Sequence, residues 1–294
     1  MRRFILIPHL KIHNANAMSS PYSIGFPAMT AWLGAMHALQ RKLNTKGHDI
    51  QLTRFAVSCH DFNLQTHKGQ NDFVHSIIGT ANPLDKDGSR PAFIEEARCH
   101  LEVSLLIEVD NLGKKQREGL LTILPEIINS MKFAGGDVLA VYDQQILDFD
   151  EDGYKDQELK PILNKLMLGH VLIERRDLVI QSMQEGQDAL DAILDYLKVT
   201  HSSQIDEHGK ATWLSARKEK GWLVPIAVGF QGISELGIAK NQRDAHTPHR
   251  FAEAVLTLGE FVMPYRIESI DQLLWQYHVD LENNLYLCQN VTTN

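Results

Sequence analysis

Cysteine is scarce in this sequence, and the few that occur are far apart. Among 294 residues the three cysteines are Cys59, Cys99 and Cys288, and no two of them stand in a C-x-x-C spacing. We therefore expect free thiols, with no disulfide framework and no metal site. Long apolar runs are also lacking, because the first, residues 4–7, ends at Pro8 and is too short for a secretory core or a membrane span. We expect a cytoplasmic protein with no membrane partner.

The short motifs that mark common enzyme classes are missing too. The sequence contains no G-x-S-x-G, no H-E-x-x-H, no G-x-x-x-x-G-K and no G-x-G-x-x-G. The pairs Cys59-His60 and Cys99-His100 lie in predicted strands, where adjacent side chains point to opposite faces, so neither pair can form a thiolate–imidazolium dyad. We predict no catalytic residues and no cofactor.

One acidic run imitates a calcium loop. Asp148, Asp150, Asp152 and Gly153 match the opening of an EF-hand, but the twelfth position, which must supply a bidentate glutamate, is Leu159. We interpret this run as a solvated acidic loop and expect no metal.

Charge is distributed unevenly along the chain. The formal net charge is −8, yet residues 1–98 contain 11 Lys and Arg against 7 Asp and Glu, while the remaining 196 residues contain 18 against 30. The first third is therefore mildly basic and the rest is acidic. This pattern excludes a general scavenger of nucleic acid and leaves room for a local binding surface.

Hydrophobic periodicity in the first half predicts an α+β fold. The expected elements are a strand from residue 4 that alternates up to His13, a helix after an N-cap at Thr30, strands near 54–60 and 100–109, a helix over 114–131 and a strand over 138–142. This order of strand, helix, strand, strand, helix, strand is that of a ferredoxin-like βαββαβ unit.

The connection between the first strand and the first helix, residues 13–27, is the leading candidate for a binding segment. It is longer than most such connections and is rich in uncharged hydrogen-bonding groups and rings. Such a mixture suits the bases and sugar hydroxyls of unpaired nucleic acid. Its candidate contact residues are His13, Asn14, Asn16, Ser19, Ser20, Tyr22 and Phe26.

The second half is harder to interpret. Residues 143–218 are acidic, with a helix expected near 187–197, and residues 221–226 are expected to be extended. Apolar spacing predicts a helix that begins near Thr247 or Pro248 and another over 270–278, with Trp275 on an outward face. Ahead of the first of these helices lies a run of basic residues that includes Lys240, Arg243, His246, His249 and Arg250.

Several stretches of the sequence resemble one protein family. The runs IPHLKIHNANAMSSPYSIGFPAMTAWLGAMHAL, NPLDKDGSRPAFIEEARCHLEVSLL, MKFAGG, GWLVPI and TPHRFAEAVLTLGEF occur in that order along the chain. Together they resemble the subunit of the type I-F CRISPR surveillance (Csy) complex that grips the 5′ handle of the CRISPR RNA. That family belongs to the RAMP superfamily, whose core resembles an RNA-recognition fold.

The resemblance implies a fold, a site and partners. It implies a RAMP core over residues 1–142 with a projecting thumb at about 66–97, and an acidic insertion with a C-terminal elaboration over 143–294. It implies RNA contacts from Lys86 and Arg90 of the thumb, from the glycine loop Gly135-Gly136, and from Arg243, His249 and Arg250. Without the resemblance, Gly135-Gly136 indicates only a helix C-cap. The implied partners are CRISPR RNA, the large and backbone subunits of the complex and, through the complex, target DNA.

Two other functions are compatible with the sequence. A metal-free endoribonuclease that processes CRISPR repeat RNA would use His9, His13, His246 or His249 as acid or base. A scaffold that contacts only protein would leave RNA to its neighbours. We predict the non-catalytic RNA-binding subunit.

Overall fold

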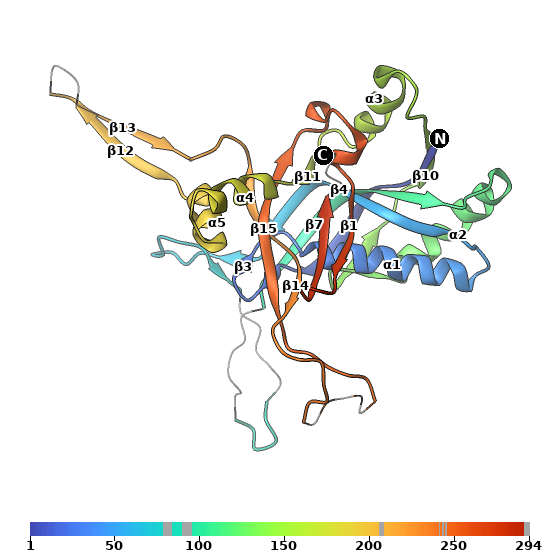
Figure 1. Ribbon diagram of the computed structural model, residues 1–294, viewed down its shortest axis with the longest axis horizontal. Helices are drawn as coiled ribbons and strands as arrows, with labels where there is room; N and C mark the ends of the chain where they lie inside the picture. Colours follow the sequence, from blue (N-terminus) through green and yellow to red (C-terminus); the bar gives the residue numbers. More distant parts are fainter. Residues whose placement is uncertain are drawn as a thin grey trace.

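One antiparallel sheet runs through most of the chain, with helices on part of its surface (Figure 1). The computed structural model describes residues 1–78, 84–89, 96–205, 209–240, 242, 244 and 246–290. Eleven strands in these ranges pair into the large sheet, and three two-stranded ladders lie outside it. Within the same ranges, no helix combines the length and apolar character that crossing a bilayer requires.

The first half of the chain contains the predicted alternation of strands and helices. In chain order its main elements are β1 (Arg2–Asn16), α1 (Met29–Thr45), β4 (Gln51–Leu64), β7 (Arg98–Asp110), α2 (Arg117–Asn129) and β9 (Gly136–Ala140). A single 3-10 turn, η1 (Lys114–Gln116), precedes α2. In the sheet these strands stand in the order β4, β7, β1, β9, and every pairing is antiparallel.

The two faces of this sheet differ because side chains alternate along each strand. On β7, alternate residues from Cys99 to Val109 pack in one core with Trp32 of α1 and Leu124 of α2. The opposite face carries a second core, where Phe4 and Leu6 of β1 lie beneath α3 (Lys155–Lys165) and residues 267–274. Farther along β1 this opposite face turns polar and exposed.

The second half extends the same sheet. Its strands are β10 (Gln145–Phe149), β11 (His170–Glu174), β14 (Leu223–Gly232), β15 (Ala252–Val262), β16 (Trp275–Asp280) and β17 (Leu285–Asn290). β10 pairs with β1, and β11 and β16 both pair with β4. Because β11 also continues through β15, β14 and β17 to β16, six strands close into a ring.

Two helices and a ribbon complete the second half. The predicted helix near 187–197 is confirmed as α5 (Ala189–Leu197), and it packs on α4 (Arg176–Gln184). After α5 the chain forms the ribbon of β12 (Thr200–Ile205) and β13 (Ala211–Ala216), which projects from the body in Figure 1.

Other segments project from the sheet. The excursion predicted as a thumb starts with a short ladder of β5 (Thr66–His67) and β6 (Ser76–Ile77). The described residues 84–89 form a turn far from the sheet in Figure 1, and the connection over 233–250 extends toward the same side.

Two predicted helices are strands instead. Residues 252–262 form β15, and residues 270–278 form a 3-10 turn, η3 (Ile270–Gln272), followed by β16. β15 is apolar on both faces, with Val255 against one core and Leu258 in another. A strand buried on both faces lacks two-residue alternation, so its spacing matched a helix by accident. Trp275 is fully buried in the core, so the prediction of an outward face was wrong, and its indole N–H donates to Leu172 O (2.9 Å).

Two local predictions near the first helix also need correction. α1 begins at Met29 with Ala28 as its N-cap, so Thr30 is not the cap. The segment 13–27 is only partly a loop, because β1 continues to Asn16 and is followed by a small hairpin of β2 (Met18–Ser20) and β3 (Ser23–Ile24).

Candidate nucleic-acid interface

Imidazole rings pair across neighbouring strands on the exposed part of the sheet. His13 of β1 stacks on His100 of β7 with ring centroids 4.2 Å apart and an interplanar angle of 13°. His9 of β1 stacks on His60 of β4 at the same centroid distance and an angle of 27°. Lys11 lies between the two pairs along β1. We call His9, Lys11, His13, His60 and His100 the histidine face.

A bulge in β1 creates this arrangement. The register of β1 against β7 shifts between Ile7 and Leu10, and His9 adopts a φ of 47° there. The His9 backbone N–H donates to Ser104 Oγ (3.1 Å), and His60 Nε2 hydrogen bonds with the same hydroxyl (2.7 Å). The bulge therefore holds the His9 backbone and the His60 ring against the same buried serine.

Two of the imidazoles on this surface have lowered pKa values. Burial, with the nearby His9, lowers the pKa of His60 to about 4, and burial also lowers the pKa of His100 beside His13. Both rings are therefore neutral near pH 7. Unpaired bases stack on such flat neutral rings.

Glu102 holds the two basic side chains of the face. Its carboxylate lies 2.7 Å from His9 Nδ1 and 3.5 Å from Lys11 Nζ. Partial burial acts to raise the pKa of Glu102, but the His9 hydrogen bond and the Lys11 charge outweigh it and lower that pKa. This contact holds the ammonium group of Lys11 beside the imidazoles.

A groove of about 720 Å³ opens where β1 ends. One wall is the small-residue side of α1, and the other walls come from the ends of β1 and β7, from the β2 strand and from the turn after α2. Its lining residues include Asn16, Met18, Ser19, Ala31, Gly34, Ala35, Ala38, Arg98, Lys132 and Gly135.

Two cations line this groove, and each is paired with one partly exposed carboxylate. Arg98 Nη2 lies 2.6 Å from Glu96 Oε2, and Lys132 Nζ lies 2.5 Å from Asp137 Oδ1. Exposed pairs of this kind contribute about 0–1 kcal/mol, so a phosphate can replace the carboxylate at little cost. Arg98 and Lys132 were not among the predicted contacts, because a lone cation in a sequence looks the same in a groove and on a solvated surface.

The predicted contact residues of the 13–27 segment differ in their exposure to solvent. His13 and Asn14 are exposed at the end of β1, and Tyr22 is 66% exposed at the tip of the β2–β3 hairpin. Asn16 is exposed, but its side chain is used locally: its Nδ2 donates to Met18 O (3.2 Å), and the Met18 N–H donates to its Oδ1 (3.0 Å). Ser19 keeps partial access to solvent.

Two residues of that segment are buried. Ser20 Oγ is 2.9 Å from Ser23 Oγ inside the small hairpin. Phe26 is only 6% exposed and stacks on Trp32, so its ring lies in the core and not on the surface of the segment. The ring of Phe26 packs in the hydrophobic core that contains Trp32 of α1.

The two predicted glycines have different roles. Gly135 has a φ of 78° and follows Ala134, whose φ is 48°, in the turn between β8 (Lys132–Phe133) and β9. This is a two-residue hairpin turn and not a helix C-cap, because α2 ends at Asn129. Gly136 is buried against β1, where a Cβ would lie 2.7 Å from His13 O.

The predicted basic contact residues belong to other elements than the histidine face and are distant from it in the sequence. Lys86 is exposed in the turn of residues 84–89, whereas Arg90 and Arg243 lie outside the described residues. In the 233–250 connection, His249 Nδ1 hydrogen bonds with Thr247 O (2.6 Å) and Arg250 contacts Asn284. Arg250 is therefore already held by a neighbouring turn.

The four histidines considered as acid or base lie in two separate parts of the described chain. His9 and His13 stack with histidines of neighbouring strands, while His246 and His249 belong to the 233–250 connection. Burial raises the pKa of the Cys59 thiol and of the Cys99 thiol to about 12 in each case, so both stay protonated. Asp148 belongs to β10 and receives two hydrogen bonds from Arg117 (2.6 and 2.8 Å), so it does not open a calcium loop.

Comparison with known proteins gives one consistent result. The family model described as CRISPR-associated protein (Cas_Csy2) matches residues 5–288. The CRISPR-associated protein Csy2 of Pseudomonas aeruginosa (strain UCBPP-PA14) is 34% identical to this chain over 309 residues. That similarity covers 96% of this chain and 93% of the relative.

Proposed function

This chain belongs to the CRISPR-associated Csy2 family, and we propose that it holds the 5′ handle of the CRISPR RNA without cutting it. Family membership makes the chain a subunit of the type I-F Csy complex, which acts in antiviral defence. The single observation that supports the RNA-binding role best is the continuity along β1 of the histidine face and the groove lined by Arg98 and Lys132.

The fold supports the proposal. We assign the first half to the RAMP type of ferredoxin-like fold, because its βαββαβ elements stand in the strand order β4, β7, β1, β9 with antiparallel pairing. RNA-recognition folds place stacking side chains on the exposed face of their sheet. Here that exposed face carries two stacked imidazole pairs, His9 with His60 and His13 with His100.

The geometry suits a single-stranded RNA end. Unpaired bases stack on neutral rings at about 1–3 kcal/mol per base, and Tyr22 offers a further exposed ring beside the face. Lys11, Lys132 and Arg98 follow one another toward the end of β1 as candidate phosphate contacts. The number of cations is small, so we expect the large and backbone subunits to supply the remaining charge.

In the proposed role the chain catalyses no reaction on the RNA. Strand cleavage by histidines requires a general acid and a general base that both reach one phosphate. The low pKa values of His60 and His100 keep these rings neutral near pH 7, and His9 is held by Glu102. We therefore propose a cytoplasmic, non-catalytic subunit that reaches target DNA only through the assembled complex.

Lysine variants in the assembled complex test this proposal. The complex is purified with a chain that carries Lys11→Ala and Lys132→Ala together, and the retained RNA is quantified and sequenced. Because both ammonium groups would bind phosphate, we expect a loss of handle-containing RNA with normal subunit content. The control is Lys165→Ala, an exposed lysine of α3 that contacts Gln145. Unchanged RNA in the double variant favours a protein-only scaffold, and RNA shortened at a fixed site favours a ribonuclease.

A further inference from the structure

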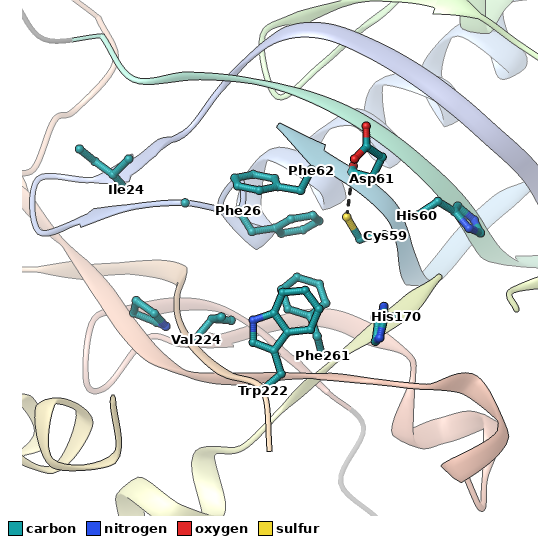
Figure 2. A pocket seen from close by; sticks show the side chains of 12 residues that line it. Ile24, Phe26, Cys59, His60, Asp61, Phe62, His170, Trp222, Val224 and Phe261 are labelled. Carbon is teal, nitrogen blue, oxygen red and sulfur yellow. Dashed lines mark hydrogen bonds between the residues drawn. The ribbon is translucent and has the colours of Figure 1, made fainter. Parts of the chain in front are cut away.

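An aromatic pocket lies beside the histidine face and is not used by the contacts described above. It has a volume of about 430 Å³ and forms where the end of β4 meets β3, β11, β14 and β15. Figure 2 shows rings on two sides of the cavity, with Phe26 and Phe62 on one side and Trp222 and Phe261 on the other. Pockets that bind small planar groups have this volume and this apolar lining.

Ring contacts between distant parts of the chain build the walls. Phe261 of β15 meets Phe26 edge-on with ring centroids 5.4 Å apart, and it meets Trp222 at 5.2 Å. His170 of β11 lies edge-on to Trp222, also at 5.2 Å. The pocket therefore depends on the ring of six strands, and no single motif in the sequence indicates it.

The pocket has a buried floor and an exposed rim. Phe26 and Phe261 are 6% and 9% exposed, whereas Trp222 is 54%, Ile24 43% and Phe62 38% exposed. An indole more than half exposed at the mouth of an apolar cavity leaves a large apolar area in water. A flat ring that entered the cavity would cover it.

Polar surroundings point to a base and not to a protein side chain. His60 of β4 lines the pocket, and its ring also stacks on His9, so the pocket and the histidine face share this residue. An anchor from a protein partner would be expected to bring an apolar surface around the cavity, but the adjoining surface contains Lys11, Glu102 and the serine-rich β2–β3 hairpin. Asp61 at the wall disfavours a phosphate inside.

From the shared His60 and the aromatic lining we infer that the pocket receives one unpaired nucleobase of the RNA that crosses the histidine face. The base stacks on Trp222 opposite Phe62, and its backbone stays outside beside His9 and Lys11. This inference rests on the proposed function, because it takes the bound RNA as the source of the base.

Position-specific crosslinking tests the pocket. The assembled complex is loaded with CRISPR RNA that carries one 5-iodopyrimidine at a time along the handle, and adducts are mapped by mass spectrometry after irradiation. We expect one handle position to give an adduct on Trp222 or Phe62. In Trp222→Leu that adduct disappears and the RNA dissociates about tenfold faster, since one stacked base is lost.

The matched control is Trp213→Leu in the β12–β13 ribbon. Trp213 is 72% exposed and does not line the pocket, so its variant should keep both the adduct and the dissociation rate. Because Trp222 is largely exposed, its variant should also keep the melting temperature of the wild type.

Each other outcome rejects the inference. If the wild-type complex keeps handle RNA but no position gives a pocket adduct, and Trp222→Leu releases RNA at the normal rate, the pocket does not bind a base while the proposed function stands. If a photoreactive residue placed at Ile24 crosslinks only to another subunit, a protein side chain occupies the pocket. If the wild-type complex holds no handle RNA, the proposed function and the pocket inference both fail.

Discussion

Single residues decide how closely the strands of the interface approach one another. Gly136 is the clearest case, because a Cβ there would lie 2.7 Å from His13 O and 2.8 Å from the backbone nitrogen of Ala15. β9 can reach β1 only without a side chain at this position. The sequence suggested Gly136 as an RNA contact, but it could not show that β1 lies against it.

Gly136→Ala should destabilise the fold. The added methyl group displaces the backbone of β1 or β9, so we expect the free energy of unfolding to fall by about 1–3 kcal/mol. Gly34→Ala is the control, because a Cβ there meets no described atom within 4 Å and a helix interior prefers alanine by about 1 kcal/mol. Urea denaturation should show opposite shifts for the two variants, and equal shifts would contradict the close approach.

His60 should make stability depend on pH. Its pKa is about 4 in the folded protein against an ordinary value of 6.5, because burial and the nearby His9 lower this pKa more than the charge of Glu102 raises it. The ring stacks on His9 and hydrogen bonds with Ser104. Between pH 6.5 and 4 the unfolded chain therefore binds a proton at this position that the folded chain does not, and stability falls as pH falls through this window. Below pH 4 both states are protonated and the effect no longer grows.

His60→Gln removes the imidazole that binds this proton and keeps a side chain that can hydrogen bond with Ser104. We expect the slope of unfolding free energy against pH between 4 and 6.5 to decrease by up to one proton relative to the wild type. Urea denaturation at several pH values measures the slope. Identical slopes in the two proteins would show that His60 titrates normally.

Among the elements, a strand whose sequence alternates between apolar and polar residues over many positions was predicted well, and strands without a long alternating run were not. β7 alternates from Cys99 to Val109, and its position follows from the sequence within two residues. β15 contacts apolar neighbours on both sides, as Val255 and Leu258 show, so its alternation is weak. β16 does alternate, but the spacing of Ile270, Leu273 and Leu274 just before it is that of a helix and extended the prediction into the strand. Their identity as strands depends on β14 and β17, which lie elsewhere in the sequence.

The β12–β13 ribbon should contribute little to stability. All twelve of its strand residues are exposed, including Trp213 and Ile205, and a two-stranded ribbon alone is marginally stable in water. We expect replacement of residues 200–216 by a short glycine-serine turn to change the free energy of unfolding by less than about 1 kcal/mol, which is a shift of about 3 °C or less in melting temperature.

A buried tryptophan provides the contrast. Trp275→Phe removes the N–H that donates to Leu172 O inside the ring of strands, so it should lower the melting temperature by more than the ribbon deletion does. The reverse order, measured by thermal denaturation monitored by circular dichroism, would mean that the ribbon packs on the body in solution.

At the scale of the whole molecule, the two halves form one continuous sheet. β11 and β16 pair with β4, and the partly buried Arg2 of β1 lies 2.6 Å from Glu108 and 2.9 Å from Asp271. The sequence indicated a mildly basic first third and an acidic remainder, but it did not indicate this closure. The residues that line the pocket come from five strands or strand ends that no local pattern connects, so only the assembled fold places them together.

Mapping the RNA 5′ end on the assembled complex tests the central claim most directly. A photoreactive group at the 5′ end of the CRISPR RNA is crosslinked within the purified complex, adducts are located by mass spectrometry, and the length of the RNA is checked. The account predicts intact RNA with adducts within residues 9–22 or on Arg98 or Lys132. Adducts confined to the acidic segment 143–218, or RNA cut at a fixed position, would contradict it.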